Sequence, residues 1–197
     1  MILPHSYCFS NSSTASENAS TAMGAGTKAS DYSSLVIGQY NLSGSIANNE
    51  ISFDIANTAF VIGKGEGNID GPNPSDAFKV MFNGDATVGN DLTVKGNIMV
   101  SSDARLKANI VSLGATLAKL LLIDGKSYTM KNDGKQKIGV LAQDIQKVFP
   151  ELVSTDDRDM LAVNYQGLVP VLINALKEQQ ADIDELKVMV KQLMLDK

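Results

Sequence analysis

The chain has 197 residues, of which 44% are hydrophobic, and a formal net charge of −5 at pH 7. This length and apolar content suffice for one domain or for two small ones. The negative charge argues against nucleic acid as a main partner, because phosphate binding requires a basic surface.

The N-terminal segment gives no sign of secretion or of metal binding. It lacks the basic region and the long apolar region of a secretory signal, and no run approaches the ~18 apolar residues needed to span a bilayer. We therefore expect synthesis in the cytoplasm. The only cysteine, Cys8, and the only histidine, His5, form no recurrent metal-ligand spacing, so we expect neither a metal nor a cofactor.

Residues 14–38 repeat at an offset of fourteen residues. Residues 14–16 recur at 28–30, residues 20–24 recur at 34–38, and Ser43-Gly44 begins a degenerate third copy. Short repeats of fixed period are typical of stacked units, each too small to bury its apolar residues alone. We expect Ala22 and Val36 to point inward on successive short strands. Gly24 and Gly38 are expected to close each turn, where a residue without Cβ tolerates positive φ.

These repeats resemble those in the heads of trimeric autotransporter adhesins. The resemblance implies a left-handed β-roll, which is also seen in phage fibres. A low-complexity Ser/Ala linker is the alternative interpretation.

Further strands are expected between the repeats and residue 100. Residues 51–55 and 59–63 are candidate strands, and the Gly- and Pro-rich segment 64–75 is expected to be a loop or turn cluster. Alternation over 78–82 predicts another strand, followed by a hairpin or bend at Asn83-Gly84-Asp85.

The stretch 88–100 places its apolar residues on even positions, with mostly polar residues between them: Val88, Leu92, Val94, Ile98 and Val100. A period of two predicts a strand with one apolar face. Such a strand is not stable alone in water, but three copies can bury their faces on a common axis. A strand in a monomeric sandwich is the alternative.

The C-terminal half is expected to be largely helical. Apolar residues at steps of three and four over 106–121 predict an amphipathic helix that ends at Asp124-Gly125. A hairpin should follow, with strands at 126–130 and 137–141 around a turn at 132–134. A short helix over 142–149 should end at Pro150, and strands near 152–153 and 161–163 should close a small sheet. The acidic cluster of Asp156, Asp157 and Asp159 around Arg158 is expected to be a solvated loop rather than a metal site.

The last helix is expected to run from about residue 165 to the C-terminus. It carries a heptad seam of Val169, Leu172, Leu176, Gln179, Ile183, Leu186, Val190 and Leu193. Pro170 falls in its first turn, where proline is tolerated. Ile and Val at the a positions with Leu at d favour two strands on the general rule for coiled coils. A helix that packs on its own domain is the alternative.

The segment 101–107 reads Ser-Ser-Asp-Ala-Arg-Leu-Lys and lies between the two compositions. Downstream follow Gly-Val-Leu-Ala-Gln-Asp at 139–144, Val-Phe-Pro-Glu-Leu-Val at 148–153 and Leu-Ala-Val-Asn-Tyr at 161–165. In this order they resemble the intramolecular chaperone auto-processing domain at the C-termini of phage tail spikes and tail fibres. The resemblance implies three copies, cleavage of the Ser101–Ser102 bond, Ser102 as nucleophile and Lys107 as its base.

Geometry constrains this dyad. Residues five apart lie about 140° apart around an ideal helix and on opposite faces of a strand, so the chain must bend or the second residue must come from another copy. We expect Lys107 in the first turn of a helix and Ser102 on the loop before it. Burial or a neighbouring cation is needed to favour a neutral lysine; Arg105 is the candidate cation, and Asp103 is expected to face away. Ser102 or Asp103 as a simple N-cap is the competing interpretation.

Together these patterns predict a mixed fold. Residues 1–101 would form an all-β fibrous half, as a β-roll or intertwined strands, and residues 102–197 an α+β chaperone domain with a coiled coil over about 166–197, in a homotrimer. The function that the resemblance implies is that of a tail fibre or spike, with the mature part in the virion. Other fibre or tail components, and a host surface receptor or glycan, are the expected partners.

Two other functions remain as alternatives. One is an uncleaved structural or adhesive trimer with a permanent C-terminal cap. The other is a membrane-tethered transcription factor of the myelin-regulatory type, a family that also carries this self-cleaving domain. The missing basic DNA-binding domain and the missing transmembrane helix count against the second.

Overall fold

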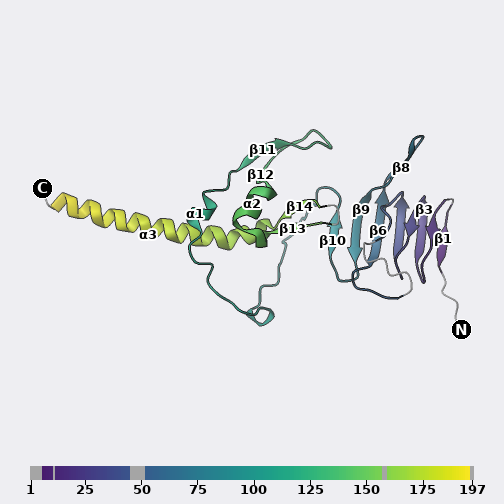
Figure 1. The fold of residues 1–197 in the computed structure, drawn as a ribbon, viewed down its shortest axis with the longest axis horizontal. Helices are drawn as coiled ribbons and strands as arrows, with labels where there is room; N and C mark the ends of the chain where they lie inside the picture. Colours follow the sequence, from purple (N-terminus) through teal and green to yellow (C-terminus); the bar gives the residue numbers. More distant parts are fainter. Residues whose placement is uncertain (1–5, 11, 45–51, 157–158, 196–197) are drawn as a thin grey trace. The chain divides into compact units, whose positions relative to one another are not determined.

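The computed structural model describes residues 6–10, 12–44, 52–156 and 159–195. The chain divides into two compact units, Met1–Val100 and Ser101–Lys197 (Figure 1). The first unit consists of β-strands, and the second combines two small sheets with a long C-terminal helix. The prediction of a mixed fold that ends in a long helix is therefore confirmed.

The first unit is built on a six-stranded sheet in the order β1-β3-β5-β6-β9-β10. Its strands are β1 (Tyr7–Phe9), β3 (Thr21–Ala25), β5 (Leu35–Gln39), β6 (Thr58–Lys64), β9 (Asp76–Met81) and β10 (Ala86–Val88). The first four run parallel, and β9 and β10 are antiparallel to their neighbours. Two small sheets accompany it, a parallel pair of β2 (Thr14–Ala15) and β4 (Lys28–Ala29) and a hairpin of β7 (Glu66–Asn68) and β8 (Gly71–Asn73).

The fourteen-residue repeat sets the register of these strands. Ala22 pairs with Val36, and Ala15 pairs with Ala29. Ala22 and Val36 are buried in one small apolar core with Ala29 and Val61, so the prediction that they point inward is confirmed. The third strand of the series follows at a longer interval, since Val36 pairs with Val61; residues 45–51 of the degenerate third copy lie outside the described residues.

Gly24 and Gly38 have positive φ, +122° and +97°, as predicted. They lie inside β3 and β5, however, and do not close turns. A Cβ on Gly24 would collide with the carbonyl oxygen of Gly38, and a Cβ on Gly38 with that of Gly63. These glycines therefore allow successive backbones to approach closely.

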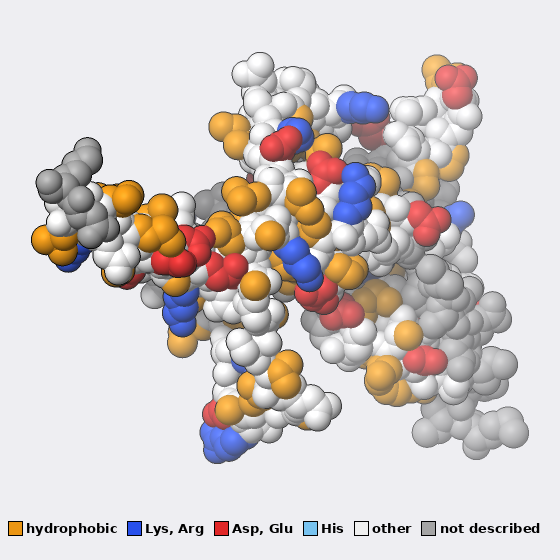
Figure 2. Space-filling model, turned by 60° about the vertical axis from the view of Figure 1, so that its left-hand side comes forward, with side chains coloured by type: hydrophobic (Ala, Val, Ile, Leu, Met, Phe, Trp, Pro, Cys, Tyr) orange, Lys and Arg blue, Asp and Glu red, His pale blue; other side chains and the backbone are white. Residues whose placement is uncertain are grey.

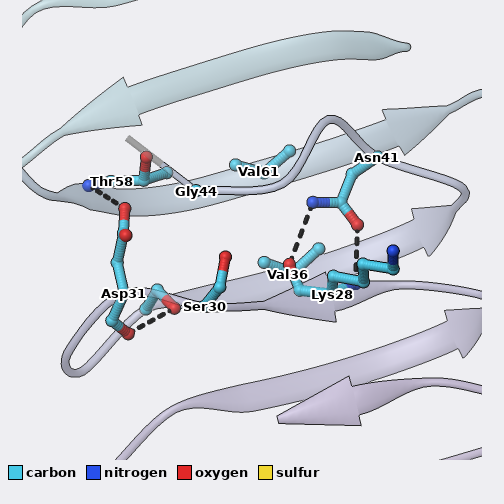
Figure 3. A pocket seen from close by; sticks show the side chains of 9 residues that line it. Lys28, Ser30, Asp31, Val36, Asn41, Gly44, Thr58 and Val61 are labelled. Atoms are coloured by element: carbon cyan, nitrogen blue, oxygen red, sulfur yellow. Dashed lines mark hydrogen bonds between the residues drawn. The ribbon is translucent and has the colours of Figure 1, made fainter. Parts of the chain in front are cut away.

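A small cavity of about 10 Å³ adjoins this core (Figure 3). The buried Asp31 carboxylate accepts a 2.7 Å hydrogen bond from the backbone N–H of Thr58. The buried Asn41 amide accepts from the N–H of Lys28 at 2.7 Å and donates to the Lys28 carbonyl oxygen at 3.0 Å. Buried polar side chains thus join the backbones of neighbouring repeats, which offsets the cost of removing them from water.

Several predictions for this unit were wrong. Residues 52–57 contain no strand, and residue 51 lies outside the described residues. The segment 64–75 contains the β7–β8 hairpin in place of a simple loop. Beyond β10, residues 89–100 form no strand, and Leu92, Val94, Ile98 and Val100 are exposed. An isolated strand leaves its backbone groups unpaired, and within one chain this segment has no neighbouring strand.

The second unit contains two hairpins and three helices. The hairpins pair β11 (Lys126–Thr129) with β12 (Gln136–Gly139), and β13 (Val153–Thr155) with β14 (Leu161–Val163). The helices are α1 (Leu117–Leu120), α2 (Ala142–Val148) and α3 (Leu168–Leu195). Both hairpins, the short helix before Pro150 and the long last helix are as predicted, with Pro170 in the first turn of α3.

The predicted helix over 106–121 was wrong. Only a 3-10 turn, η1 (Ala104–Leu106), and the four-residue α1 form there. Asn109 and Gly114 have φ of +52° and +65°, which no right-handed helix accommodates. The apolar residues of the intervening stretch are exposed: Leu106, Ile110, Val111 and Leu113.

The core of the second unit is formed by Ile145, Phe149 and Val171. α3 contributes Val171 and Ala175, its two buried residues, to the interior. The seam residues Val169, Leu172, Leu176, Ile183, Leu186, Val190 and Leu193 are all exposed, and so is Gln179. α3 therefore packs on its own domain with one face and leaves the heptad seam uncovered. Figure 2 shows hydrophobic side chains among charged ones along the arm that α3 forms.

Candidate active site

Ser102 and Lys107 are in direct contact. The Nζ of Lys107 donates a 2.7 Å hydrogen bond to the Oγ of Ser102. Ser102 lies before η1, and Lys107 follows it in an extended conformation, with φ −123° and ψ +144°. The chain bends between them, as the geometry required. The bend is a single 3-10 turn, and the expectation that Lys107 lies in the first turn of a helix was wrong.

Asp103 organises this turn from its N-terminal end. Its carboxylate accepts a 2.8 Å hydrogen bond from the backbone N–H of Arg105, which makes Asp103 the N-cap of η1. At the other end, the N–H of Lys107 donates to the carbonyl oxygen of Ala104 at 3.1 Å. The N-cap interpretation of Asp103 and the contact between Ser102 and Lys107 therefore hold together.

Arg105 binds Asp103 through its side chain as well. The guanidinium Nη2 lies 2.7 Å from Asp103 Oδ2, and Nε donates to both carboxylate oxygens at 3.1 Å. The side-chain hydrogen bond from Arg105, followed by the backbone one, lowers the pKa of Asp103. The same side-chain bond raises the pKa of Arg105. The charge of the candidate cation is thus matched by a carboxylate.

Ser101, Ser102 and Lys107 are all exposed within their own unit. The second unit therefore does not bury the lysine, and Arg105 is engaged by Asp103.

The segment after Lys107 is tied to α3 by Glu178, a residue that the sequence analysis treated only as a charged flank of the seam. The Glu178 carboxylate accepts hydrogen bonds from the backbone N–H groups of Thr116 and Leu117 and so caps α1. The Thr116 hydroxyl donates to the Val171 carbonyl oxygen at 2.9 Å. No local sequence signal identifies this cap, because its donors lie about sixty residues away in the chain.

The three downstream segments of the motif build the core of the second unit. Phe149 of the second segment is a core residue, and Val140 of the first segment and Val163 of the third pack against the core. The Tyr165 hydroxyl accepts a 3.2 Å hydrogen bond from the N–H of Val140, which joins the first segment to the third. These segments therefore stabilise the domain and do not contribute side chains to the Ser102–Lys107 contact.

The described residues offer neither a cluster of metal ligands nor a membrane-spanning helix. Within the described ranges, no group of three His, Cys, Asp or Glu side chains is placed to hold a metal ion. Cys8 is exposed, and its Sγ donates to the Ser13 carbonyl oxygen at 3.0 Å. His5, Asp157 and Arg158 lie outside the described residues. In the described part of the chain, no helix combines the length and the apolarity needed to cross a lipid bilayer.

Comparison with known proteins confirms the resemblance of the C-terminal half. Residues 102–154 match the peptidase S74 family, described as the chaperone of endosialidase. The match begins at Ser102. The chain is also similar to long tail fiber proteins Gp37 of several phages. It is 34% identical to that of Escherichia phage AR1 over 42% of this chain and 8% of the relative. It is 32% identical to that of Enterobacteria phage M1 over 46% of this chain and 40% of the relative. It is 30% identical to that of Salmonella phage S16 over 49% of this chain and 14% of the relative. The chain thus spans less than half the length of these relatives.

Proposed function

We propose that this chain is a phage-type tail-fibre or tail-spike protein whose C-terminal unit trimerises the chains and then releases itself by cutting the Ser101–Ser102 bond. The observation that carries the proposal is the 2.7 Å hydrogen bond between Lys107 Nζ and Ser102 Oγ, next to the boundary between the two units. The family match over residues 102–154 and the similarity to long tail fiber proteins support it.

In the proposed reaction, Ser102 is the nucleophile and Lys107 the general base. Neutral Lys107 takes the proton of the Ser102 hydroxyl, and Oγ attacks the carbonyl carbon of Ser101. The C–N bond breaks as the C–O bond forms, and the Ser102 nitrogen receives the proton and becomes a free amine. Water then hydrolyses the ester, which leaves a Ser101 carboxylate and restores the Ser102 hydroxyl. Asp103 and Arg105 support the dyad by holding the turn between its two members.

In this proposal, trimerisation comes before cleavage and explains why the C-terminal unit is later removed. The exposed heptad seam of α3 is the proposed coiled coil, which raises the effective concentration of the three β units. Contacts between chains are non-local and slow to form, so a coiled coil that keeps the three chains together should speed the folding of a β fibre. Cleavage after folding removes the C-terminal unit with its coiled coil and leaves the fibre kinetically trapped. A second copy packed against the exposed dyad would also bury Lys107, which couples the reaction to assembly.

The first unit is, in this proposal, a β-roll segment of the fibre. The parallel strands paired at the repeat offset support that architecture. The chain would be made in the bacterial cytoplasm, and its mature part would reside in the virion tail fibre or a similar particle. It would join other fibre or tail components there and contact a host surface receptor or glycan.

Intact-mass measurement of freshly made protein tests the proposal. We expect the wild type to give two fragments that meet between Ser101 and Ser102, and Ser102→Ala and Lys107→Ala to give one full-length chain. Ser101→Ala is the matched control: it alters the adjacent serine but not the nucleophile, and it should still be cut. A wild type that stays whole under trimer-forming conditions, or a Ser102→Ala variant that is cut, would overturn the peptidase role.

The alternative is an uncleaved structural or adhesive fibre with a permanent C-terminal trimerisation cap, from a phage, a prophage or a contractile injection system. The exposure of Ser102 and Lys107 in the single chain favours it. The same measurement decides between the two, because this alternative requires a full-length wild-type chain in a stable trimer.

A further inference from the structure

The six-stranded sheet of the first unit has two unlike faces. Paired residues project to the same side of a sheet, and neighbours along a strand project to opposite sides. Ala22, Val36 and Val61 project into the apolar core. The opposite face, here called the outer face, consists of two rows that cross β1, β3, β5, β6 and β9. The first row is Tyr7, Thr21, Leu35, Phe60 and Val80, and the second is Phe9, Met23, Ile37, Ile62 and Phe78.

The outer face is apolar but is not the face that the chain itself buries. Every member of the two rows except Thr21 is apolar, and none belongs to the buried core cluster. Tyr7 and Phe9 are 53% and 60% exposed, Met23 is 43% exposed and Leu35 is 39% exposed, and the other members of the two rows are half-buried. A contiguous apolar surface of this kind marks an interaction site in a soluble protein.

We propose that the outer face is where copies of this chain meet in the β unit. Neither row contains a charged residue, so copies that meet through this face bring no like charges together and leave no charge buried without a partner. The face also continues into the segment expected to lie on the trimer axis. Val88 of β10 pairs with Phe78 in the second row, and it is also the first of the even-numbered apolar residues that run on to Val100.

The size of the outer face indicates what holds it together. Five strands at ~4.8 Å spacing span about 20 Å, and two rows of side chains along the strands cover roughly 13 Å, which gives an area on the order of 300 Å² per copy. A stable interface buries about 800 Å² per partner. The outer face therefore closes only when another contact holds the copies together, and the exposed seam of α3 supplies it. This inference thus rests on the trimer of the proposed function.

Thiol labelling tests the surface in the full chain. The background carries Cys8→Ser, which removes the native thiol, and Ser102→Ala, which keeps the chain intact. Met23→Cys places the probe on the outer face, and Leu35→Cys is a second probe in the other row. Thr14→Cys, on the exposed residue of β2 outside both rows, is the matched control. Adding Ile183→Glu and Leu186→Glu breaks the seam, and light scattering reports the mass of each assembly.

We expect a trimer in which the two outer-face thiols react at least about tenfold more slowly than the control, because labelling must await separation of the copies. Breaking the seam should give monomers in which all three thiols react at similar rates. Outer-face thiols that react as fast as the control in a trimer would overturn this surface alone and leave the proposed function standing. Equal protection in the monomer would also overturn it, since the chain's own residues would then cover the face. A monomer in the chain with an intact seam would overturn both the outer-face interface and the trimer of the proposed function. Absence of cleavage in the wild-type chain, measured by intact mass, would overturn only the peptidase role.

Discussion

Lys107 Nζ lies 2.7 Å from Ser102 Oγ, although five residues separate them, because a single 3-10 turn folds the chain between the two. No packed core holds this turn, since all its residues are exposed. Its geometry depends instead on hydrogen bonds. The Asp103 carboxylate caps the first end and binds the Arg105 side chain, and the N–H of Lys107 closes the second end. The distance between Ser102 and Lys107 therefore depends on Asp103, a residue that takes no part in the proposed bond-breaking step.

Asp103→Ala should slow self-cleavage, and Asp103→Asn should largely preserve it. Alanine removes the N-cap acceptor, whereas asparagine caps as well as aspartate. We expect cleavage about fivefold slower for the alanine variant, as the formed turn becomes less populated. Asp133 offers a matched control, because it accepts from the Lys135 N–H at 3.0 Å and pairs with the Lys135 ammonium at 3.2 Å. Time-resolved intact mass should give equal cleavage rates for Asp133→Ala and the wild type. Slow cleavage of Asp103→Asn would contradict the capping role and show that the charge of Asp103 matters instead.

The turn should persist in mildly acidic solution. The side-chain and backbone hydrogen bonds from Arg105 hold the pKa of Asp103 below its ordinary value of 3.8. For a carboxyl with a lowered folded pKa, the stabilisation is fully present above the ordinary value and is lost as the pH falls through the folded value. In a Ser102→Ala chain, the amide shift of Arg105 followed by NMR should therefore inflect below pH 3.8. An inflection at or above that pH would contradict the pairing, and Asp103→Asn should abolish the step.

Glu178→Ala should destabilise the second unit, because it uncaps α1 and releases the segment after Lys107 from α3. Two buried or half-buried N–H groups lose their acceptor, which costs about 1–2 kcal/mol. Glu185 is the control, since it stands one heptad further along α3 and is exposed; Glu185→Ala should change the free energy of unfolding by less than about 0.5 kcal/mol. Denaturant unfolding of the Ser102→Ala background measures both, and equal effects of the two variants would argue against the capping role.

Gly24→Ala should be far more harmful than Gly84→Ala, although both glycines have positive φ. At Gly84 nothing lies within 4 Å of an added Cβ, so only backbone strain is introduced, at a cost of about 1 kcal/mol. At Gly24 the Cβ would also meet the carbonyl oxygen of Gly38, which brings the total to about 3 kcal/mol or more. Thermal unfolding of the first unit, followed by circular dichroism, should rank the variants in that order; similar melting temperatures would mean that β3 and β5 can separate without cost.

Sequence periodicity predicted elements correctly wherever a chain buries its own apolar face. The inward positions of Ala22 and Val36 and the two hairpins of the second unit belong to this class. The failures are also periodic: residues 107–116 form no helix and residues 89–100 form no strand, and Ile110, Leu113, Leu92 and Ile98 are exposed. Periodicity indicates that a face is to be buried but does not say by which chain.

The site shows a similar limit. The spacing of Ser102 and Lys107 required a bend, and the bend is present. The pairing of Asp103 with Arg105, and the reach of Glu178 to Thr116, depend on side-chain geometry and on contacts between distant segments. The N-cap role of Asp103 was among the interpretations that the local sequence allowed, whereas no local pattern of residue types encodes the contact of Glu178.

The repeat register has a consequence for the length of the six-stranded sheet. Because β3 and β5 pair at the offset of one repeat, inserting a further fourteen-residue copy would add one strand, about 4.8 Å of sheet. Every inward alanine and valine would keep its neighbours, and so would every glycine at a close backbone approach. Duplication or deletion of the DNA that encodes one repeat would then lengthen or shorten the sheet in equal steps of one strand.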